Sequence, residues 1–131
     1  MINFLPLEKE VLDKLLDGDH PVLALLRDQL AQAKIKERTY SGSGFFLELI
    51  VDEELAIPKK PNFHIGDVAA DIAGLQYGSG FIIFVNSGLL DTFEGASYEE
   101  DWPKEIPQFK VKYMTDGARD MAKLEKALSS I

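Results

Sequence analysis

The tetrapeptide Gly-Ser-Gly-Phe occurs twice in this chain, and each copy leads into an apolar run of the length of a β-strand. The first copy opens the run Phe45–Val51, and the second opens the run Phe81–Val85. Glycine-rich loops that bind phosphate lead into a helix instead, because the amides at the start of the helix hold the anion. The two segments therefore predict turns of a sheet and argue against a nucleotide-binding loop.

A duplicated strand-turn-strand unit is one explanation for the pair, and independent use of the same turn chemistry is the other. Glycine adopts positive φ angles in tight turns, and a phenylalanine after the turn starts a buried strand. The residues around the two tetrapeptides, which begin at positions 42 and 78, match poorly. We therefore favour shared turn chemistry and predict no repeat architecture.

The first 33 residues predict two amphipathic helices that form a hairpin. Apolar residues recur at helical spacing over Leu7–Leu16, and Gly18 is suited to end that helix. A second helix is entered through Pro21, after a cap at Asp19 or His20. The apolar stripe of this helix consists of Val22, Leu25, Leu26 and Leu30.

The rest of the chain predicts a mainly antiparallel sheet of about five to six strands, because no long crossovers separate the apolar runs. A surface loop is expected over 52–62, which holds two prolines. The predicted strands are Ile35–Tyr40, Phe45–Val51, Val68–Leu75, Phe81–Val85, Leu89–Glu94 and Phe109–Met114.

A final helix is predicted after the last strand, with Thr115 or Asp116 as its cap. Its core-facing residues are expected to be Ala118, Met121, Leu124 and Leu128. The expectation is therefore one α+β domain over residues 1–131, in which the N-terminal helical hairpin and the C-terminal helix pack on the same face of the sheet.

Composition excludes several classes of protein. The chain has 131 residues and no cysteine, so disulfides, thiol catalysis and cysteine-ligated zinc are ruled out. It contains no run of eighteen apolar residues, so we expect no membrane span. The first residues lack the basic and apolar parts of a secretion signal, which favours a cytoplasmic location.

The net charge of −8 is concentrated in one part of the chain. Such an acidic balance argues against binding to nucleic acids or anionic membranes, both of which need a basic patch. Like charges this dense favour a solvated face, a bound cation or a basic partner. Residues 65–103 contain no Lys or Arg and carry the seven acids Asp67, Asp71, Asp91, Glu94, Glu99, Glu100 and Asp101.

Four of these acids are candidates for catalysis: Asp67, Asp71, Asp91 and Glu94. If the hairpins pair as predicted, Asp71 approaches Asp91 or Glu94 across the sheet. Two carboxylates close together in a cleft raise the pKa of one of them, as general acid–base catalysis and glycoside hydrolysis require. The alternative is that these acids lie on a solvated strand face or form turns.

The segment Tyr98-Glu99-Glu100-Asp101-Trp102 is a candidate binding surface. It lacks the ligand spacing of a calcium-binding loop. Tyrosine and tryptophan are common interface anchors, and adjacent acids steer a basic partner. Alternatively, Trp102 is a core residue that pins this loop to the sheet.

Histidines and serines give no catalytic or metal-binding pattern. His20 and His64 are the only histidines, and their spacing does not match a zinc site. Neither Ser43 nor Ser79 lies in the Gly-x-Ser-x-Gly sequence of a nucleophile elbow. We therefore expect no metal and no cofactor.

Several short motifs are arranged along the first 103 residues. They are Gly18-Asp19-His20-Pro21-Val22-Leu23, Gly44-Phe45-Phe46, Ile65-Gly66-Asp67-Val68, Gly74-Leu75, Gly78-Ser79-Gly80-Phe81, Gly88-Leu89-Leu90-Asp91, Glu94-Gly95 and Trp102-Pro103. In this set the chain resembles a family of small bacterial proteins with no established activity. The resemblance implies a bacterial, free-standing single domain and supplies no catalytic residue. Some small acidic proteins of this kind lie beside toxin genes as immunity factors, so an immunity-like role agrees with it.

The sequence favours a non-catalytic binding module whose acidic face meets a basic protein or peptide. A homodimer formed through an edge strand is compatible with this interpretation. The alternative is a small hydrolase that uses a carboxylate-lined cleft. A concave site in which the four candidate acids converge favours the enzyme, and acids spread over the surface favour the module.

Overall fold

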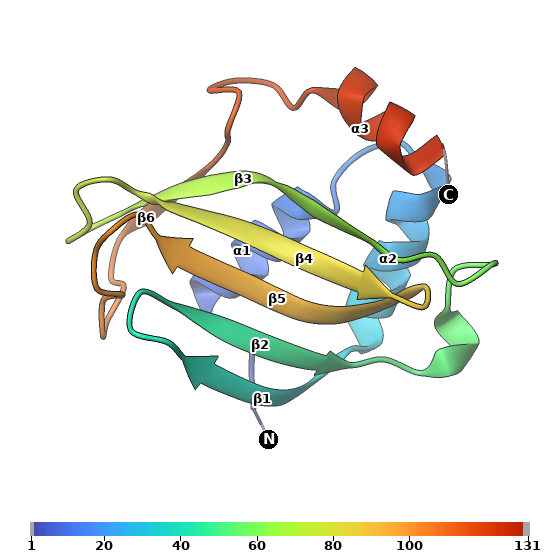
Figure 1. Cartoon of the computed structure of the whole chain (residues 1–131), viewed down its shortest axis with the longest axis horizontal. Helices are drawn as coiled ribbons and strands as arrows, with labels where there is room; N and C mark the ends of the chain where they lie inside the picture. Colours follow the sequence, from blue (N-terminus) through green and yellow to red (C-terminus); the bar gives the residue numbers. More distant parts are fainter. Residues whose placement is uncertain (1, 130–131) are drawn as a thin grey trace.

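The computed structural model describes residues 2–129, which build a helical layer on one face of a six-stranded antiparallel sheet (Figure 1). The α+β architecture expected from the sequence is confirmed. The elements in chain order are α1 (Pro6–Leu15), α2 (Pro21–Gln32), β1 (Lys34–Tyr40), β2 (Gly44–Ile50), a short 3₁₀ turn η1 (Glu53–Leu55), β3 (Phe63–Ile72), β4 (Ser79–Asn86), β5 (Leu89–Ser97), β6 (Phe109–Tyr113) and α3 (Met121–Ser129).

The strand order is β1-β2-β5-β4-β3-β6, and every neighbouring pair is antiparallel. Three hairpins connect strands that follow each other in the chain, and β5 joins the β1–β2 hairpin to the rest of the sheet. At the other edge, β6 pairs only with Val68–Ile72 of β3. The first half of β3 is therefore left without a strand on that side.

The two Gly-Ser-Gly-Phe segments lie on either side of β5. Phe45 on β2 and Phe81 on β4 are both opposite Gly95, and both point into the core. A Cβ atom on Gly95 would lie 2.5 Å from Cε1 of Phe45 and 2.8 Å from Cδ1 of Phe81. The rings of Phe45 and Phe81 therefore occupy the space beside Gly95 on β5, where a larger residue would clash with them.

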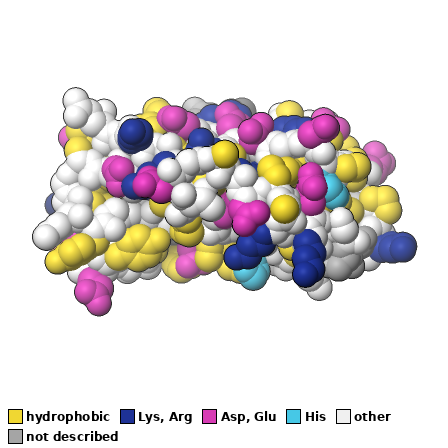
Figure 2. Space-filling view, turned by 90° about the horizontal axis from the view of Figure 1, so that it is seen from above, with side chains coloured by type: hydrophobic (Ala, Val, Ile, Leu, Met, Phe, Trp, Pro, Cys, Tyr) yellow, Lys and Arg dark blue, Asp and Glu magenta, His cyan; other side chains and the backbone are white. Residues whose placement is uncertain are grey.

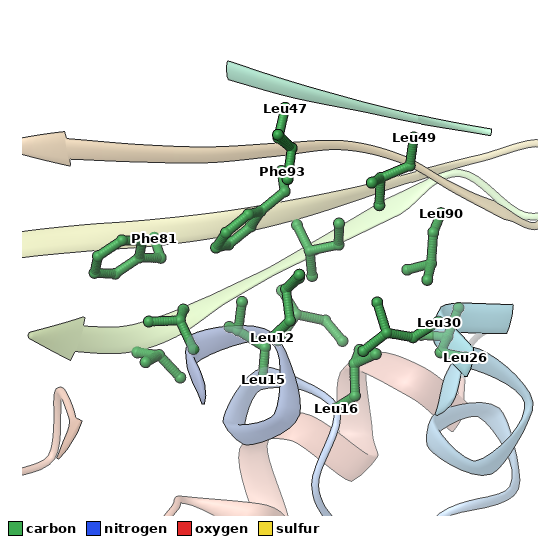
Figure 3. Close-up of a cluster of buried hydrophobic side chains, with 14 of the residues drawn as sticks. Leu12, Leu15, Leu16, Leu26, Leu30, Leu47, Leu49, Phe81, Leu90 and Phe93 are labelled. Carbon is green, nitrogen blue, oxygen red and sulfur yellow. The ribbon is translucent and has the colours of Figure 1, made fainter. Parts of the chain in front are cut away.

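Helices α1 and α2 cover the inner face of the sheet with leucines at helical spacing. Leu12 and Leu15 of α1 and Leu26 of α2 are fully buried. Figure 3 shows these leucines directed toward Phe93 and its neighbours on the sheet. Burial of a leucine or phenylalanine contributes about 1.5–3 kcal/mol, so this layer supplies most of the stabilisation.

The helical hairpin forms as the sequence predicts, but its second helix buries Leu23, and the predicted core residue Leu25 is exposed. Of the two predicted caps, His20 fills the role, because its Nδ1 accepts a hydrogen bond from the Val22 amide at 3.1 Å. Gly18 has a φ angle of 139°, a conformation that favours glycine, and it ends the first helix. The turn between the two helices is therefore set by local chemistry.

The predicted start of the last helix is wrong. Asp116 has a φ angle of 60° and is followed by Gly117, so the chain turns before the helix begins. The cap is Asp120, whose Oδ1 accepts a hydrogen bond from the Lys123 amide at 3.1 Å. Ala118 lies before the helix, where its carbonyl accepts a hydrogen bond from the Thr115 hydroxyl.

Two further expectations need correction. The third strand begins at Phe63, before the predicted Val68, because an irregularity between Ile65 and Val68 interrupts the alternation that the prediction relied on. Helix α3 does not lie squarely over the face that α1 and α2 cover. It stands beside the uncovered half of β3, where Leu128 is buried (Figure 1).

Candidate functional site

The sheet face opposite α1 and α2, here called the open face, has α3 along its β3 edge and no described helix over β2, β5 and β4 (Figure 1). Strand alternation places every second side chain there. The middle of this face combines apolar, small and acidic side chains, which are Phe46, Glu48, Gly80, Ile82, Phe84, Thr92, Glu94 and Ala96.

A groove crosses the open face between α3 and β5. Its larger part, of about 490 Å³, lies between α3 and the β3–β4 pair. Its smaller part, of about 190 Å³, extends from there toward Glu94 and Tyr98. The two parts share Gly66, Ile82 and Met114, so they adjoin one another.

Two glycines beside the groove let neighbouring side chains pack directly on the sheet. A Cβ atom on Gly80 would lie 2.5 Å from the Tyr98 hydroxyl oxygen, and one on Gly66 would lie 3.0 Å from Cγ1 of Ile82. Both Tyr98 and Met114 are about half exposed, so they form walls rather than part of the core. Gly66 on β3 and Gly80 on β4 therefore let Ile82 and Tyr98 lie close against the sheet beside the groove.

The charge of the open face is acidic over β2 and β5, whereas β1 carries Lys34 and Lys36 as well as Glu37. Strands β2, β4 and β5 contain no Lys or Arg. Glu37 on β1 is directly opposite Glu48 on β2, and like charges in that position destabilise a sheet. Glu94 lies between Phe46 on β2 and Ile82 on β4. Within residues 2–129, no hydrogen bond or ion pair reaches the carboxylates of Glu37, Glu48 or Glu94.

The four acids predicted as catalytic candidates do not converge. Asp67 lies in the larger part of the groove, and Glu94 lies in the smaller part. Asp71 lines a separate shallow hollow beside β6, and Asp91 lines another beside η1. Asp67 and Glu94 therefore line different parts of the groove, Asp71 and Asp91 lie outside it, and none of these hollows is lined by a pair of these acids, as paired-carboxylate catalysis requires.

Three of these four acids also have partners of their own. Asp67 binds Arg119 through two contacts, at 2.8 Å from Nε and 3.0 Å from Nη2. Asp71 is 3.2 Å from the Lys112 ammonium, and Asp91 accepts a hydrogen bond from the Asn86 amide at 2.7 Å. Glu94 is the one acid of the four candidates whose carboxylate has no partner among the described residues.

The predicted binding segment 98–102 is divided between the two faces of the sheet. Tyr98 lies on the open face beside Gly80. Trp102 lies on the inner side, where its ring is 5.3 Å from that of Phe45 and 6.3 Å from that of Phe81. The alternative considered for Trp102, a residue that pins the loop to the sheet, is the one observed.

The acids between these two aromatics have different environments. The Glu100 carboxylate accepts hydrogen bonds from the amides of Gln76 and Tyr77, both at 2.9 Å, so it holds the β3–β4 turn. Glu99 and Asp101 are exposed and face solvent. The run therefore contributes one structural residue and no continuous acidic surface.

Charge is mixed on the side of the molecule that carries α3. Figure 2 shows acidic and basic side chains interspersed there, with apolar side chains between them. His64 is exposed on the open face, with its ring 5.8 Å from that of Phe84. Among residues 2–129, no three His, Asp or Glu side chains are grouped as metal ligands.

The covered side holds the strongly bonded polar groups. Glu8 is buried and binds the Arg38 guanidinium at 2.6 and 2.8 Å. The hydrogen bond to Glu8 raises the pKa of Arg38. Burial raises the pKa of Tyr113, whose hydroxyl donates to the Lys14 carbonyl at 2.9 Å. These groups are used within the fold.

Sequence reasoning missed Phe46, Glu37 and Glu48. The apolar run Phe45–Val51 predicts a largely buried strand, although Glu48 interrupts it. The alternation of burial along β2 shows that Phe46, Glu48 and Ile50 all face outward. A period-two reading of this strand would have found them.

Comparisons with protein-family models, with curated proteins and with solved structures find no match to this chain. No helix among residues 2–129 has both the length and the hydropathy needed to cross a bilayer.

Proposed function

We propose that this protein is a non-catalytic binding module whose open face takes an extended, basic segment of a partner protein. The observation that carries the proposal is the set of three unpartnered glutamates, Glu37, Glu48 and Glu94, around an uncovered apolar sheet face. A basic segment would neutralise these charges and cover the apolar side chains between them.

The shape of the groove favours a peptide segment over a compact ligand. The two adjoining parts of the groove extend from α3 to Tyr98 and are open to solvent along their length. Gly66, Gly80 and Ala96 line them beneath the side chains of Ile82, Tyr98 and Met114. Tyr98 and Met114 supply the aromatic and thioether contacts that are enriched at protein interfaces.

The sheet edges are less suited to a partner strand. Edge strand β1 carries Lys34, Lys36 and an irregularity between Ile35 and Glu37, and edge strand β6 carries Lys110 and Lys112. Charged residues and bulges of this kind protect edges from pairing with other chains. They therefore favour the open face over an edge-strand homodimer.

The hydrolase alternative gains no support from the geometry. Its four acids lie in separate hollows, and Asp67 and Asp71 are each paired with a base. Glycoside hydrolysis needs two carboxyl groups within roughly 5–10 Å of one another on either side of a substrate.

The test is a nuclear magnetic resonance titration of the ¹⁵N-labelled protein with the peptide acetyl-(Lys-Leu)₃-amide. We expect saturable shifts at the amides of Phe46, Ile82 and Glu94. The acidic peptide acetyl-(Glu-Leu)₃-amide serves as the control and should leave these amides unmoved. Shifts spread over α1 and α2, or equal shifts with both peptides, would refute the proposal.

A further inference from the structure

We infer that the smaller part of the groove is a pocket for one cationic side chain with a long aliphatic stem, a lysine or arginine of the partner segment. This inference rests on the proposed function and adds the chemical class that one position of the segment must have. The residues that carry it are Glu94, Tyr98, Met114, Ile82, Gly80 and Ala96.

The lining of the pocket is apolar except at one point. Glu94 is the one charged residue among the described residues that line it. Ile82 and Met114 offer aliphatic and thioether surface, and the small residues Gly80 and Ala96 also line the pocket, with Tyr98 over Gly80. Lysine and arginine bury such stems along apolar surface while the charged end meets a carboxylate.

The state of Glu94 is the second part of the argument. Its side chain is half-buried between Phe46 and Ile82, its neighbours across the sheet. Removing a carboxylate partly from water has a free-energy cost unless a donor or a cation compensates it. No residue of 2–129 donates to Glu94, so its carboxylate is free to bind a cationic group of a partner.

Tyr98 completes the pocket. Its ring stands over Gly80, and its hydroxyl oxygen occupies the space that a side chain there would need. Because Tyr98 is about half exposed, part of its ring remains free to contact a ligand. A cation within about 6 Å of an aromatic ring is attracted to its face, which adds to the attraction of the carboxylate.

Other ligand classes fit this pocket less well. An anion would meet Glu94 and no base. Calcium takes roughly six to eight oxygen ligands, and one carboxylate among apolar side chains does not supply them. A wholly apolar ligand would leave the Glu94 carboxylate covered and without a partner.

The experiment uses n-butylammonium chloride, which reproduces the end of a lysine side chain, and n-butanol as a neutral control of equal length. We expect n-butylammonium to shift the amides of Gly80 and Ala96 and the methyl of Met114, with saturation at millimolar concentration. Glu94→Gln should weaken this binding at least about tenfold, which corresponds to about 1.4 kcal/mol. Glu54→Gln, an exposed acid on η1, should change it less than twofold.

A second variant separates the shape of the pocket from its charge. Gly80→Ala keeps Glu94 but places a methyl group against the Tyr98 hydroxyl, so it should also abolish the n-butylammonium shifts. Equal shifts with n-butanol, or unchanged binding in Glu94→Gln, would overturn the inference. A well-dispersed amide spectrum of each variant shows that it has folded.

The peptide and n-butylammonium experiments together test the pocket separately from the proposed binding function. If acetyl-(Lys-Leu)₃-amide binds the open face but Glu94→Gln leaves its affinity unchanged, the pocket is wrong and the binding module stands. If that peptide does not bind at all, the proposed function fails. In that case, n-butylammonium binding would not rescue it.

Discussion

The same residue types have different environments on the two faces of the sheet. Two adjacent phenylalanines on strand β2 show this difference. Phe45 points toward the helices and is 2% exposed, whereas Phe46 points away from them and is 37% exposed. Phe45 contacts Phe81, Phe93 and Trp102, as a core residue does. Phe46 has acidic side chains around it. Apolar surface that the fold does not bury is therefore available for a partner.

Glutamates on the two faces differ in the same way. Glu8 on the covered side accepts hydrogen bonds from Arg38 and from the Leu5 amide. Glu94 on the open face has no such partner in the described part of the chain. A charge that is fully bonded inside the fold contributes to structure. A half-buried charge without a partner is better explained by binding.

The largest expected difference between the faces is in packing. Phe45→Ala should lower the free energy of unfolding by about 3–5 kcal/mol, because it empties a buried aromatic site. Phe46→Ala should lower it by about 1 kcal/mol, since much of that ring already contacts water. Urea denaturation of both variants measures the two losses. Equal losses would mean that the open face is as much a part of the core as the inner face.

The next largest effect concerns the two glutamates. Glu8→Gln should lower the free energy of unfolding by about 2–3 kcal/mol, somewhat less than for a fully buried pair because Arg38 is partly exposed. Glu94→Gln should change it by no more than about 0.5 kcal/mol. Thermal and urea unfolding at pH 7 provide both values. A large loss in Glu94→Gln would show that Glu94 has a structural role.

A smaller effect is expected at Tyr113 on the covered side. Tyr113→Phe should lower the free energy of unfolding by about 1.5 kcal/mol at pH 8, because the hydroxyl no longer donates to the Lys14 carbonyl.

This difference should depend on pH. Burial raises the folded-state pKa of Tyr113 above its ordinary value of 10.0, so the folded protein holds this proton more tightly than the unfolded chain. The stabilisation is therefore complete below pH 10 and is lost as the pH rises through the folded pKa. The unfolding free energies of the wild type and Tyr113→Phe should converge above pH 10. A constant difference up to pH 11 would contradict this explanation.

The sequence predicts the local parts of the fold well. The helical hairpin, the strands near the two Gly-Ser-Gly-Phe turns and the His20 cap all follow from spacing and turn chemistry. The placement of β5 between β2 and β4 does not, because pairing between distant strands leaves no local pattern. The start of the last helix was misplaced, because the turn at Asp116 is a backbone feature that composition does not reveal.

The candidate site was predicted only in part. Glu94 and Tyr98 were named from the acidic segment, but with Asp91 and Trp102 as companions that lie elsewhere. Each strand side chain faces one side of the sheet or the other, and a run of neighbours in sequence is divided between them. Alternation along β2 indicates that Phe46 and Glu48 face outward, but their position beside Glu94 and Thr92 depends on cross-strand pairing, which the sequence alone does not specify.

The most direct test compares two variants with the same change in net charge. One carries Glu37→Lys, Glu48→Lys and Glu94→Lys on the open face. The other carries Glu10→Lys, Asp28→Lys and Glu54→Lys at exposed positions of α1, α2 and η1.

The affinity of each for acetyl-(Lys-Leu)₃-amide is measured by calorimetry at about 150 mM salt, where charges more than about 8 Å apart are largely screened. We predict that the open-face variant binds at least about tenfold more weakly than the wild type and that the other variant binds within about twofold of it. Equal losses in both variants would show that overall charge alone attracts the peptide, and would contradict a binding site on the open face.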